Sequence, residues 1–173
     1  MDIRKIQLSD QAAYQRFEQA VLEDKNTNPF VEWWAVDDFE QFVANSDRSE
    51  VKKDQQTWSP FTRYFAFIEG EIAGFVICFW EIDHPDCLKL GHIGYLVAPN
   101  FRRQGIATTL IQFALQQYVQ RGISTVLVVT DEINTPCRNL VEHLGGQLFR
   151  VETIDYFDKA MTAACYELST EEP

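Results

Sequence analysis

The sequence predicts a mixed α/β fold with about seven strands and about four helices, and three stretches carry this prediction. Residues 61–81 are typical of two strands joined by a Glu69-Gly70 turn. Residues 91–97 alternate as a strand does, and the apolar period becomes helical from residue 105 onward. Residues 124–130 are apolar and β-branched, as in a buried parallel strand. We therefore expect a central mixed, mostly antiparallel sheet.

The N-terminal third is expected to add one strand and two helices. The strand covers residues 2–7, and a helix follows the capping pair Ser9-Asp10 until residues 26–29 break it. A second helix is expected over residues 36–44, and the polar segment 46–60 is expected to be an exposed loop.

The C-terminal part is expected to add one helix and two strands. Residues 84–86 are expected to be a loop, and the helix that starts at Thr135-Pro136 should stop at Gly145-Gly146. Two late strands over residues 147–151 and 163–168 complete the sheet.

Composition limits the class of protein. At 173 residues, with 46% hydrophobic and 13% aromatic residues, the chain is expected to be one domain, residues 1–173, with a substantial core. The net charge of −11 disfavours binding to nucleic acid or to anionic membranes. No apolar run is long enough to span a bilayer, no signal peptide is recognised, and the four cysteines lack a CxxC pair. These features predict a soluble, cytoplasmic protein with reduced thiols.

The passage from strand to helix at residues 102–107 is suited to binding an anion. The first turn of a helix has amide N–H groups without partners and carries the positive end of the helix dipole. Gly105 allows close approach to the backbone, and Arg102 and Arg103 add positive charge. We interpret this turn as a pyrophosphate cradle; the alternative is a helix with a basic start on a solvated surface.

The same residues resemble the acetyl-CoA signature of the GNAT superfamily of N-acetyltransferases. The pattern Arg102-x-x-Gly105-x-Ala107 follows a strand that ends Leu96-Val97-x-Pro99. Residues 71–75 resemble the third strand of that family, and residues 134–145 resemble its fourth helix. The run GHIGYLVAPNFRRQGIA is most similar to uncharacterised bacterial predicted acetyltransferases. The resemblance implies a single-domain GNAT-like fold in which two parallel strands splay apart.

The resemblance also implies acetyl-CoA as the cosubstrate and a set of residues that bind it. The pantetheine arm would pair with backbone groups of the strand, and an amide near Leu96 would stabilise the oxyanion. Asn134 would contact the same arm, or it would only cap the helix. The implied binding residues are Leu96, Val97, Arg102, Arg103, Gln104, Gly105, Ile106, Ala107, Thr108 and Asn134.

Acetyl transfer to an amine needs a base and an acid, and the sequence offers candidates for both. His92 lies ten residues before Arg102, where related lysine acetyltransferases have their base, so we expect it to be the base. Glu81 is expected to orient or replace it; both residues have ordinary structural alternatives. Val141 stands where many relatives have an acidic tyrosine, which leaves Tyr95, Tyr118 and Cys137 as unranked candidates for the acid.

A metal site is a competing interpretation of the cluster His84, Asp86, Cys87 and His92. These are metal-ligand types, but their spacing matches no tetrahedral zinc pattern, so we expect no metal.

The acceptor is expected to be a primary amine of a small molecule or peptide. Aromatic and acidic residues near position 33 are expected to shape its groove: Phe30, Glu32, Trp33, Trp34, Asp37 and Asp38. The predicted activity is direct acetyl transfer from acetyl-CoA to that amine, by a monomer or a homodimer. The alternatives are an inactive acyl-CoA sensor and an interaction protein, and Val141 favours the sensor.

Overall fold

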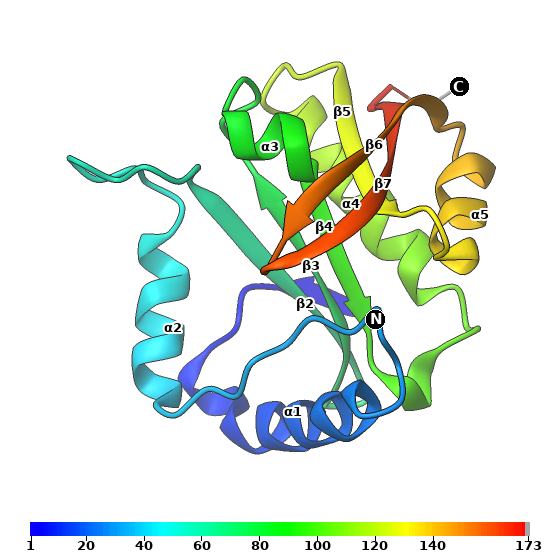
Figure 1. Ribbon diagram of the computed structural model, residues 1–173. Helices are drawn as coiled ribbons and strands as arrows, with labels where there is room; N and C mark the ends of the chain where they lie inside the picture. Colours follow the sequence, from blue (N-terminus) through cyan, green and yellow to red (C-terminus); the bar gives the residue numbers. More distant parts are fainter. Residues whose placement is uncertain (172–173) are drawn as a thin grey trace.

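The computed structural model describes residues 1–171 and arranges seven strands in two antiparallel sheets (Figure 1). The first sheet has the order β1-β2-β3-β4, with bounds Asp2–Arg4, Phe61–Ile68, Glu71–Phe79 and Ile93–Val97. The second has the order β5-β7-β6, where β5 is Thr125–Asp131, β6 is Gln147–Tyr156 and β7 is Lys159–Ser169.

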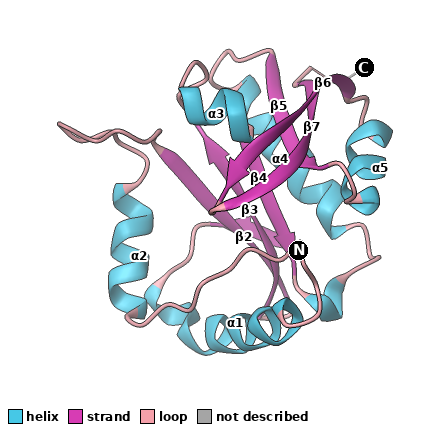
Figure 2. Cartoon of the chain, in the orientation of Figure 1, coloured by secondary structure: helices cyan, strands magenta, loops and turns pink. Residues whose placement is uncertain are grey.

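Five α-helices and two short 3-10 turns accompany the sheets (Figure 2). The helices are α1 (Gln11–Lys25), α2 (Phe39–Arg48), α3 (Pro85–Leu90), α4 (Ile106–Val119) and α5 (Thr135–His143). The 3-10 turns are Leu8–Asp10 and Pro99–Phe101. The predicted mixed α/β fold class is confirmed. No helix in the described part of the chain has the length and apolarity needed to cross a bilayer.

The first sheet separates two hydrophobic cores because successive residues of a strand point to opposite faces. Phe65 and Phe75 pack with aromatic residues of α1 and α2 on one face. Ala66 and Val76 pack with α4 on the other. The chain thus builds a helix layer on each side of β2 and β3.

Among residues 1–171, the backbone hydrogen bonds that join the two sheets lie near the start of β4, and the prediction of one mixed sheet is corrected there. Gly91 forms an isolated bridge with Val128, and the His92 N–H donates to Leu127 O at 2.8 Å. A Cβ atom at Gly91 would lie 3.0 Å from Val129 N, so β5 approaches this closely because Gly91 has no side chain. Every ladder among residues 1–171 is antiparallel, and β4 and β5 belong to separate sheets.

Several boundaries differ from the predicted ones. Residues 84–86, expected as a loop, start α3, because His84 accepts a hydrogen bond from Asp86 N–H as the N-cap and Pro85 fits the first turn. Helix α2 starts at Phe39, where Asp38 caps it, and extends to Arg48. The late strands are longer than expected, since β6 and β7 form a hairpin that continues to a turn at residues 157–158.

Candidate functional site

The connection between β4 and α4 is built from residues in left-handed conformations. Arg103 has φ of 60° and Gly105 has φ of 77°, so the turn directs successive N–H groups to one side. The first backbone hydrogen bond of α4 runs from Thr109 N–H to Gly105 O. Within residues 1–171, no protein group accepts a hydrogen bond from the N–H groups of residues 103–108. This run of free donors at a helix N-terminus is the geometry that binds phosphate.

Gly105 is suited to its place in this turn for two reasons. Its left-handed φ strains any residue with a side chain. An added Cβ atom would meet no atom within 4 Å, so the space above the backbone is open. The donors and this open space fit the pyrophosphate of acetyl-CoA.

The charge near the cradle comes from Arg103 rather than from Arg102. Arg102 donates to Val97 O at 3.3 Å and makes two hydrogen bonds, of 3.1 and 2.6 Å, to the Asp24 carboxylate at the end of α1. These bonds from the guanidinium hold the pKa of Asp24 below its usual range. The guanidinium of Arg102 is thus paired with a carboxylate in this structure, and anion binding by Arg102 stays a prediction. Arg103 is exposed.

The free edge of β4 carries backbone groups for the pantetheine arm, but not those of Leu96. Ala98 N–H bonds Ala73 O, and hydrogen-bonded pairs alternate along an antiparallel ladder. Leu96 therefore directs its backbone groups to its partner Phe75, whereas Val97 and Tyr95 direct theirs away from β3. Of the two predicted residues, Val97 alone offers a free group, its N–H, because its carbonyl oxygen accepts the hydrogen bond from Arg102.

Asn134 and Cys137 stand at the start of α5, close to Tyr95. The Asn134 side chain accepts a hydrogen bond from Cys137 N–H at 3.3 Å, which establishes the capping role. Its amide nitrogen makes no hydrogen bond within residues 1–171 and is free to donate. The Tyr95 hydroxyl donates to Cys137 Sγ at 3.1 Å, and burial raises the pKa of Tyr95, which keeps the phenol protonated.

His92 does not have the geometry of a general base, which corrects the prediction. Its ring is buried, and Leu127 N–H donates to Nδ1 at 2.8 Å. The proton must then lie on Nε2, which donates to Ile82 O at 2.9 Å. Burial lowers the pKa of His92 further. Both ring nitrogens are thus engaged with backbone groups, and His92 joins β4, β5 and the residue-82 turn as a structural link.

Glu81 does not orient His92. Its carboxylate accepts two hydrogen bonds from Lys52 Nζ, at 2.9 and 2.8 Å, on the surface. Tyr118 is also excluded as the acid, because its buried hydroxyl contacts Phe79 O and His92 O at 3.0 and 2.7 Å. Val141 is fully buried. Tyr95 therefore remains the best placed hydroxyl near the free edge of β4.

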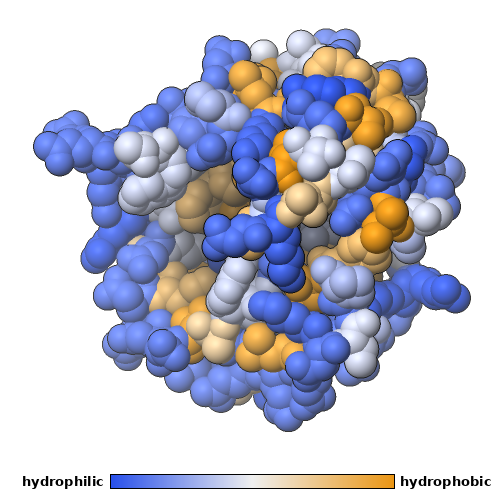
Figure 3. All heavy atoms as spheres, viewed as in Figure 1, coloured by the Kyte–Doolittle hydropathy of each residue, from blue (hydrophilic) through white to orange (hydrophobic). Residues whose placement is uncertain are grey.

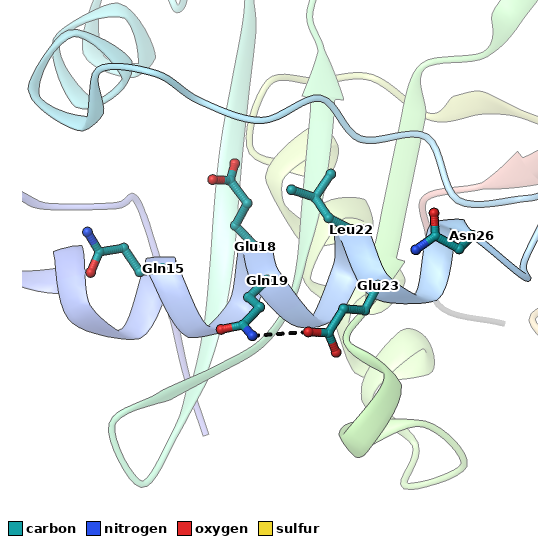
Figure 4. Close-up of a pocket in the computed structure, with 6 residues that line it drawn as sticks. All are labelled: Gln15, Glu18, Gln19, Leu22, Glu23 and Asn26. Atoms are coloured by element: carbon teal, nitrogen blue, oxygen red, sulfur yellow. Dashed lines mark hydrogen bonds between the residues drawn. The ribbon is translucent and has the colours of Figure 1, made fainter.

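The loop between α1 and α2 is held in place by a carboxylate of α1. Glu18 points from α1 toward this loop (Figure 4), where Trp33 Nε1 and Val36 N–H donate to its Oε1 at 3.1 and 2.9 Å. The pocket drawn there lies on the outer surface of α1, along Gln15 to Asn26, and is separate from the cradle. Trp33 is consequently buried, although it was expected in the acceptor groove.

Trp34 connects the same loop to the β6–β7 hairpin. Its ring lies 4.9 Å from the ring of Phe157 at the hairpin turn, and Lys25 Nζ lies 4.9 Å from the Trp34 centroid. Phe30 and Trp34 are exposed, as a groove rim requires. The loop and the hairpin thus meet over the first sheet.

Arg63 was not singled out from the sequence. It lies on β2 at a position that shares its face with Phe65 and Phe67, which belong to the core beneath α1. A charged residue at a core-facing position of an apolar strand is a signal that the sequence does contain.

The four residues of the possible metal cluster are dispersed. His84 caps α3 and contacts Thr57 O at 2.6 Å, Cys87 is buried, and His92 has the contacts given above. Residues 1–171 hold no group of three or more histidine, cysteine or acidic side chains that is arranged to bind a metal.

Solved structures with a similar fold are N-acetyltransferases. The ribosomal-protein-S18-alanine N-acetyltransferase from Escherichia coli is 18% identical, with 99% of this chain and 95% of that chain covered and a TM-score of 0.61. A ribosomal L7/L12 α-N-protein acetyltransferase in complex with coenzyme A is 18% identical over 96% of this chain and 92% of that one, with a TM-score of 0.71. An N-acetyltransferase from Staphylococcus aureus Mu50 is 18% identical over 98% of each chain, with a TM-score of 0.67.

At these identities the likeness establishes the fold, and the sequence family establishes more. A comparison with curated proteins found no match. The model of the acetyltransferase (GNAT) family matches residues 27–145, which include β4, the cradle and α5. The chain therefore belongs to the acetyltransferase (GNAT) family, which confirms the predictions of an acetyltransferase enzyme and of acetyl-CoA as its cosubstrate.

Proposed function

We propose that this enzyme transfers the acetyl group of acetyl-CoA directly to a primary amine at the free edge of β4. The observation that carries the proposal is the run of N–H donors at residues 103–108, for which residues 1–171 provide no acceptor. These donors lie next to β4, whose outer edge has free backbone groups at Tyr95 and a free N–H at Val97. A phosphate site beside an unpaired strand edge suits a ligand with a pyrophosphate and an amide-containing arm.

Different residues bind different parts of acetyl-CoA. The N–H groups of residues 103–108 and the charge of Arg103 bind the pyrophosphate, and the edge of β4 with the Asn134 amide holds the arm. Acetyl-CoA supplies the acetyl group as a thioester. A free N–H of β4, at Tyr95 or Val97, stabilises the developing oxyanion, replacing the amide near Leu96 that the sequence favoured.

The transfer forms a nitrogen–carbon bond and breaks a carbon–sulfur bond. The amine must attack in its neutral form, so its proton passes to solvent before or during attack. The thiolate of coenzyme A leaves and takes a proton from the Tyr95 hydroxyl. Tyr95 suits this role because its phenol is protonated and its hydroxyl already donates to a sulfur atom, Cys137 Sγ. The tyrosinate then recovers a proton from solvent, which its raised pKa favours.

The proposal extends to the whole chain. Residues 1–173 form one acetyltransferase domain, which is supported by the pairing of β5 with the late hairpin. The four free cysteines suit a reducing compartment such as the cytoplasm. The enzyme works as a monomer or a homodimer.

Acetyl transfer to a panel of amines tests the proposal. Purified protein is incubated with acetyl-CoA and small amines, amino acids or short peptides; the free thiol is measured, and products are identified by mass spectrometry. We expect amine-dependent thiol release and at least one acetylated product.

A protein that binds acetyl-CoA in a calorimeter but acetylates no amine would support the alternative of an acyl-CoA sensor. That alternative rests on Val141, which occupies a position where many relatives have a tyrosine.

A further inference from the structure

We propose that Arg63 binds a carboxylate of the acceptor, so that the substrate is a small molecule carrying both an amine and a carboxylate, as an amino acid does. This inference rests on the proposed acetyl transfer and names the class of its substrate. It is carried by a guanidinium that lies among aromatic rings and forms no ion pair with any residue of the described part of the chain.

Arg63 lies in the middle of the first sheet, on the face covered by α1 and α2. It is paired with Ile77 of β3, and Ile77 is paired with Gly94 of β4. Paired residues of neighbouring strands point to the same face, so this row leads across the sheet from Arg63 to β4. The side of Arg63 that faces the core is the side on which the α1–α2 loop and the β6–β7 hairpin meet.

The guanidinium has aromatic neighbours, and no acidic side chain of residues 1–171 forms an ion pair with it. Its Cζ lies 5.2 Å from the ring centroid of Phe75, 5.4 Å from that of Trp33 and 5.6 Å from that of Phe42. Within residues 1–171, no side chain or carbonyl accepts a hydrogen bond from Arg63, and its Nε is fully enclosed. Burial lowers the pKa of Arg63 to about 10. Ring faces compensate only part of the cost of burying a charge, so the positive charge of Arg63 is incompletely compensated within residues 1–171.

The remaining donors of Arg63 reach accessible space. The residue as a whole is half-buried, while Nε is the one enclosed nitrogen among its three side-chain nitrogens. The two terminal nitrogens form the fork that matches a carboxylate with two parallel hydrogen bonds. A bound carboxylate would give this fork the partner that residues 1–171 do not provide.

The carboxylate site is close to the edge where transfer is proposed. Phe75, the aromatic neighbour with the shortest distance, is paired with Leu96 of β4, between Tyr95 and Val97. Adjacent strands lie about 5 Å apart, so Arg63 on β2 is two strand spacings, or about 10 Å, from β4 along the sheet. Gly94 has no side chain, and a Cβ atom there would lie 2.9 Å from Ile77 Cγ2. The Ile77 side chain therefore covers Gly94, and a substrate that reaches from Arg63 to the β4 edge would pass over this apolar side chain.

The enclosure favours a small substrate over a folded protein. Figure 3 shows a recess on this face, between the β6–β7 hairpin and α2, with hydrophobic atoms inside it. The Trp34–Phe157 contact joins the α1–α2 loop to the hairpin at one side of this region. An anion on Arg63 lies beneath these elements, where a free amino acid fits and a protein surface does not.

Binding of N-acetylated amino acids tests the inference without requiring turnover. Each N-acetyl amino acid and its carboxamide are titrated into the coenzyme A complex of the wild-type protein, and then into Arg63→Met. For at least one amino acid, we expect the wild type to bind the carboxylate about 10-fold or more tightly than the carboxamide. In Arg63→Met the preference should fall to less than about 2-fold. The carboxylate loses its ion pair with the guanidinium, whereas the affinity of the carboxamide changes little.

Arg121→Met is the matched control, since Arg121 Cζ also lies over an aromatic ring, 3.5 Å from the Trp80 centroid. It should keep the carboxylate preference. Arg63→Met should fold and bind coenzyme A as the wild type does, because it removes an uncompensated charge and keeps an apolar chain of similar length. A wild type without carboxylate preference, or a preference that survives Arg63→Met, overturns the inference. So does binding that is confined to acidic peptides.

The outcome is separable from that of the proposed function. Arg63-dependent carboxylate binding in a protein that acetylates no amine would retain the carboxylate site and refute the transfer. Acetylation of amines with no effect of the carboxylate would retain the transfer and refute the site.

Discussion

The two ends of β4 differ in how completely their polar groups are paired. At the start of the strand, both nitrogens of the buried His92 ring have backbone partners, in Leu127 and Ile82. At the other end, the N–H groups of residues 103–108 have no acceptor within residues 1–171, although they lie at the start of a long helix.

This difference indicates that a ligand site is better recognised by polar groups without hydrogen-bond partners than by the type of residue. Histidine is a common catalytic residue, yet His92 has no free lone pair for an amine proton. Backbone amides have no side-chain chemistry, yet a row of unpaired ones leaves an anion site. The predictions below test the two ends separately.

The largest effect is expected for Gly105→Glu. A carboxylate in the cradle repels the pyrophosphate, and the left-handed φ of 77° strains the new residue. We expect the dissociation constant for acetyl-CoA, measured by calorimetry, to rise about 1,000-fold, which corresponds to about 4 kcal/mol.

Gly122→Glu is the control for this variant. Gly122 also has a left-handed φ, of 71°, and open space around it, but it lies beyond the other end of α4. It should bind acetyl-CoA as the wild type does. Equal affinities for the two variants would contradict the assignment of the cradle.

The second effect is on stability, in His92→Ala. The substitution leaves the buried Leu127 N–H and Ile82 O without partners and opens a cavity, and each buried unsatisfied group costs about 1–3 kcal/mol. We expect urea denaturation to show a free energy of unfolding lower by about 3 kcal/mol.

The turnover number of the folded fraction should change less than about 3-fold, whereas loss of a general base costs about 100-fold or more. The exposed His143 at the end of α5 supplies the control, and His143→Ala should leave the free energy of unfolding unchanged. A His92→Ala protein with unchanged stability and 100-fold slower turnover would support His92 as the general base.

The third effect concerns the proposed acid and is measured with Tyr95→Phe. This change removes the hydroxyl that donates to Cys137 Sγ and keeps the ring. A thiolate leaves moderately well without an acid, so we expect a fall of about 10-fold in the turnover number, equivalent to about 1.4 kcal/mol, and an unchanged affinity for acetyl-CoA. Tyr64→Phe, on β2 of the same sheet, should have neither effect. Wild-type turnover in Tyr95→Phe would remove the residue from the proposed mechanism.

The smallest effect is the pH dependence of stability that His92 contributes. Burial lowers its pKa in the folded state, so below about pH 6.5 the unfolded state binds the proton more readily and stability falls with falling pH. Between pH 6.5 and 5.5 we expect the wild type to lose up to about 1 kcal/mol more than His92→Ala. Parallel losses in urea titrations at the two pH values would show that the imidazole can be protonated in place.

Much of the fold follows from local patterns in the sequence. The β2–β3 hairpin, the helix after Gly105 and the apolar strand β5 were predicted because alternation, helical period and turn residues are local signals. Helix α3 was missed because it has six residues and depends on its caps. The separation into two sheets was missed because pairing between distant strands leaves no local pattern.

The site was predicted unevenly for the same reason. The cradle depends on the left-handed backbone conformation at Gly105, and the glycine in the sequence indicates this conformation. The partners of His92 and Arg102 do not show in the sequence, since Leu127 lies 35 residues from His92 and Asp24 lies 78 residues from Arg102. Only the folded chain reveals which polar groups are already satisfied.

Amide hydrogen exchange with and without acetyl-CoA tests the contrast between the two ends of β4 most directly. In the free protein, the N–H groups of residues 103–108 should exchange quickly, and that of Leu127, bound to His92, should exchange slowly. Acetyl-CoA should slow the exchange of residues 103–108 strongly and change Leu127 little. Exchange at residues 103–108 that is unaffected by saturating acetyl-CoA would contradict the account.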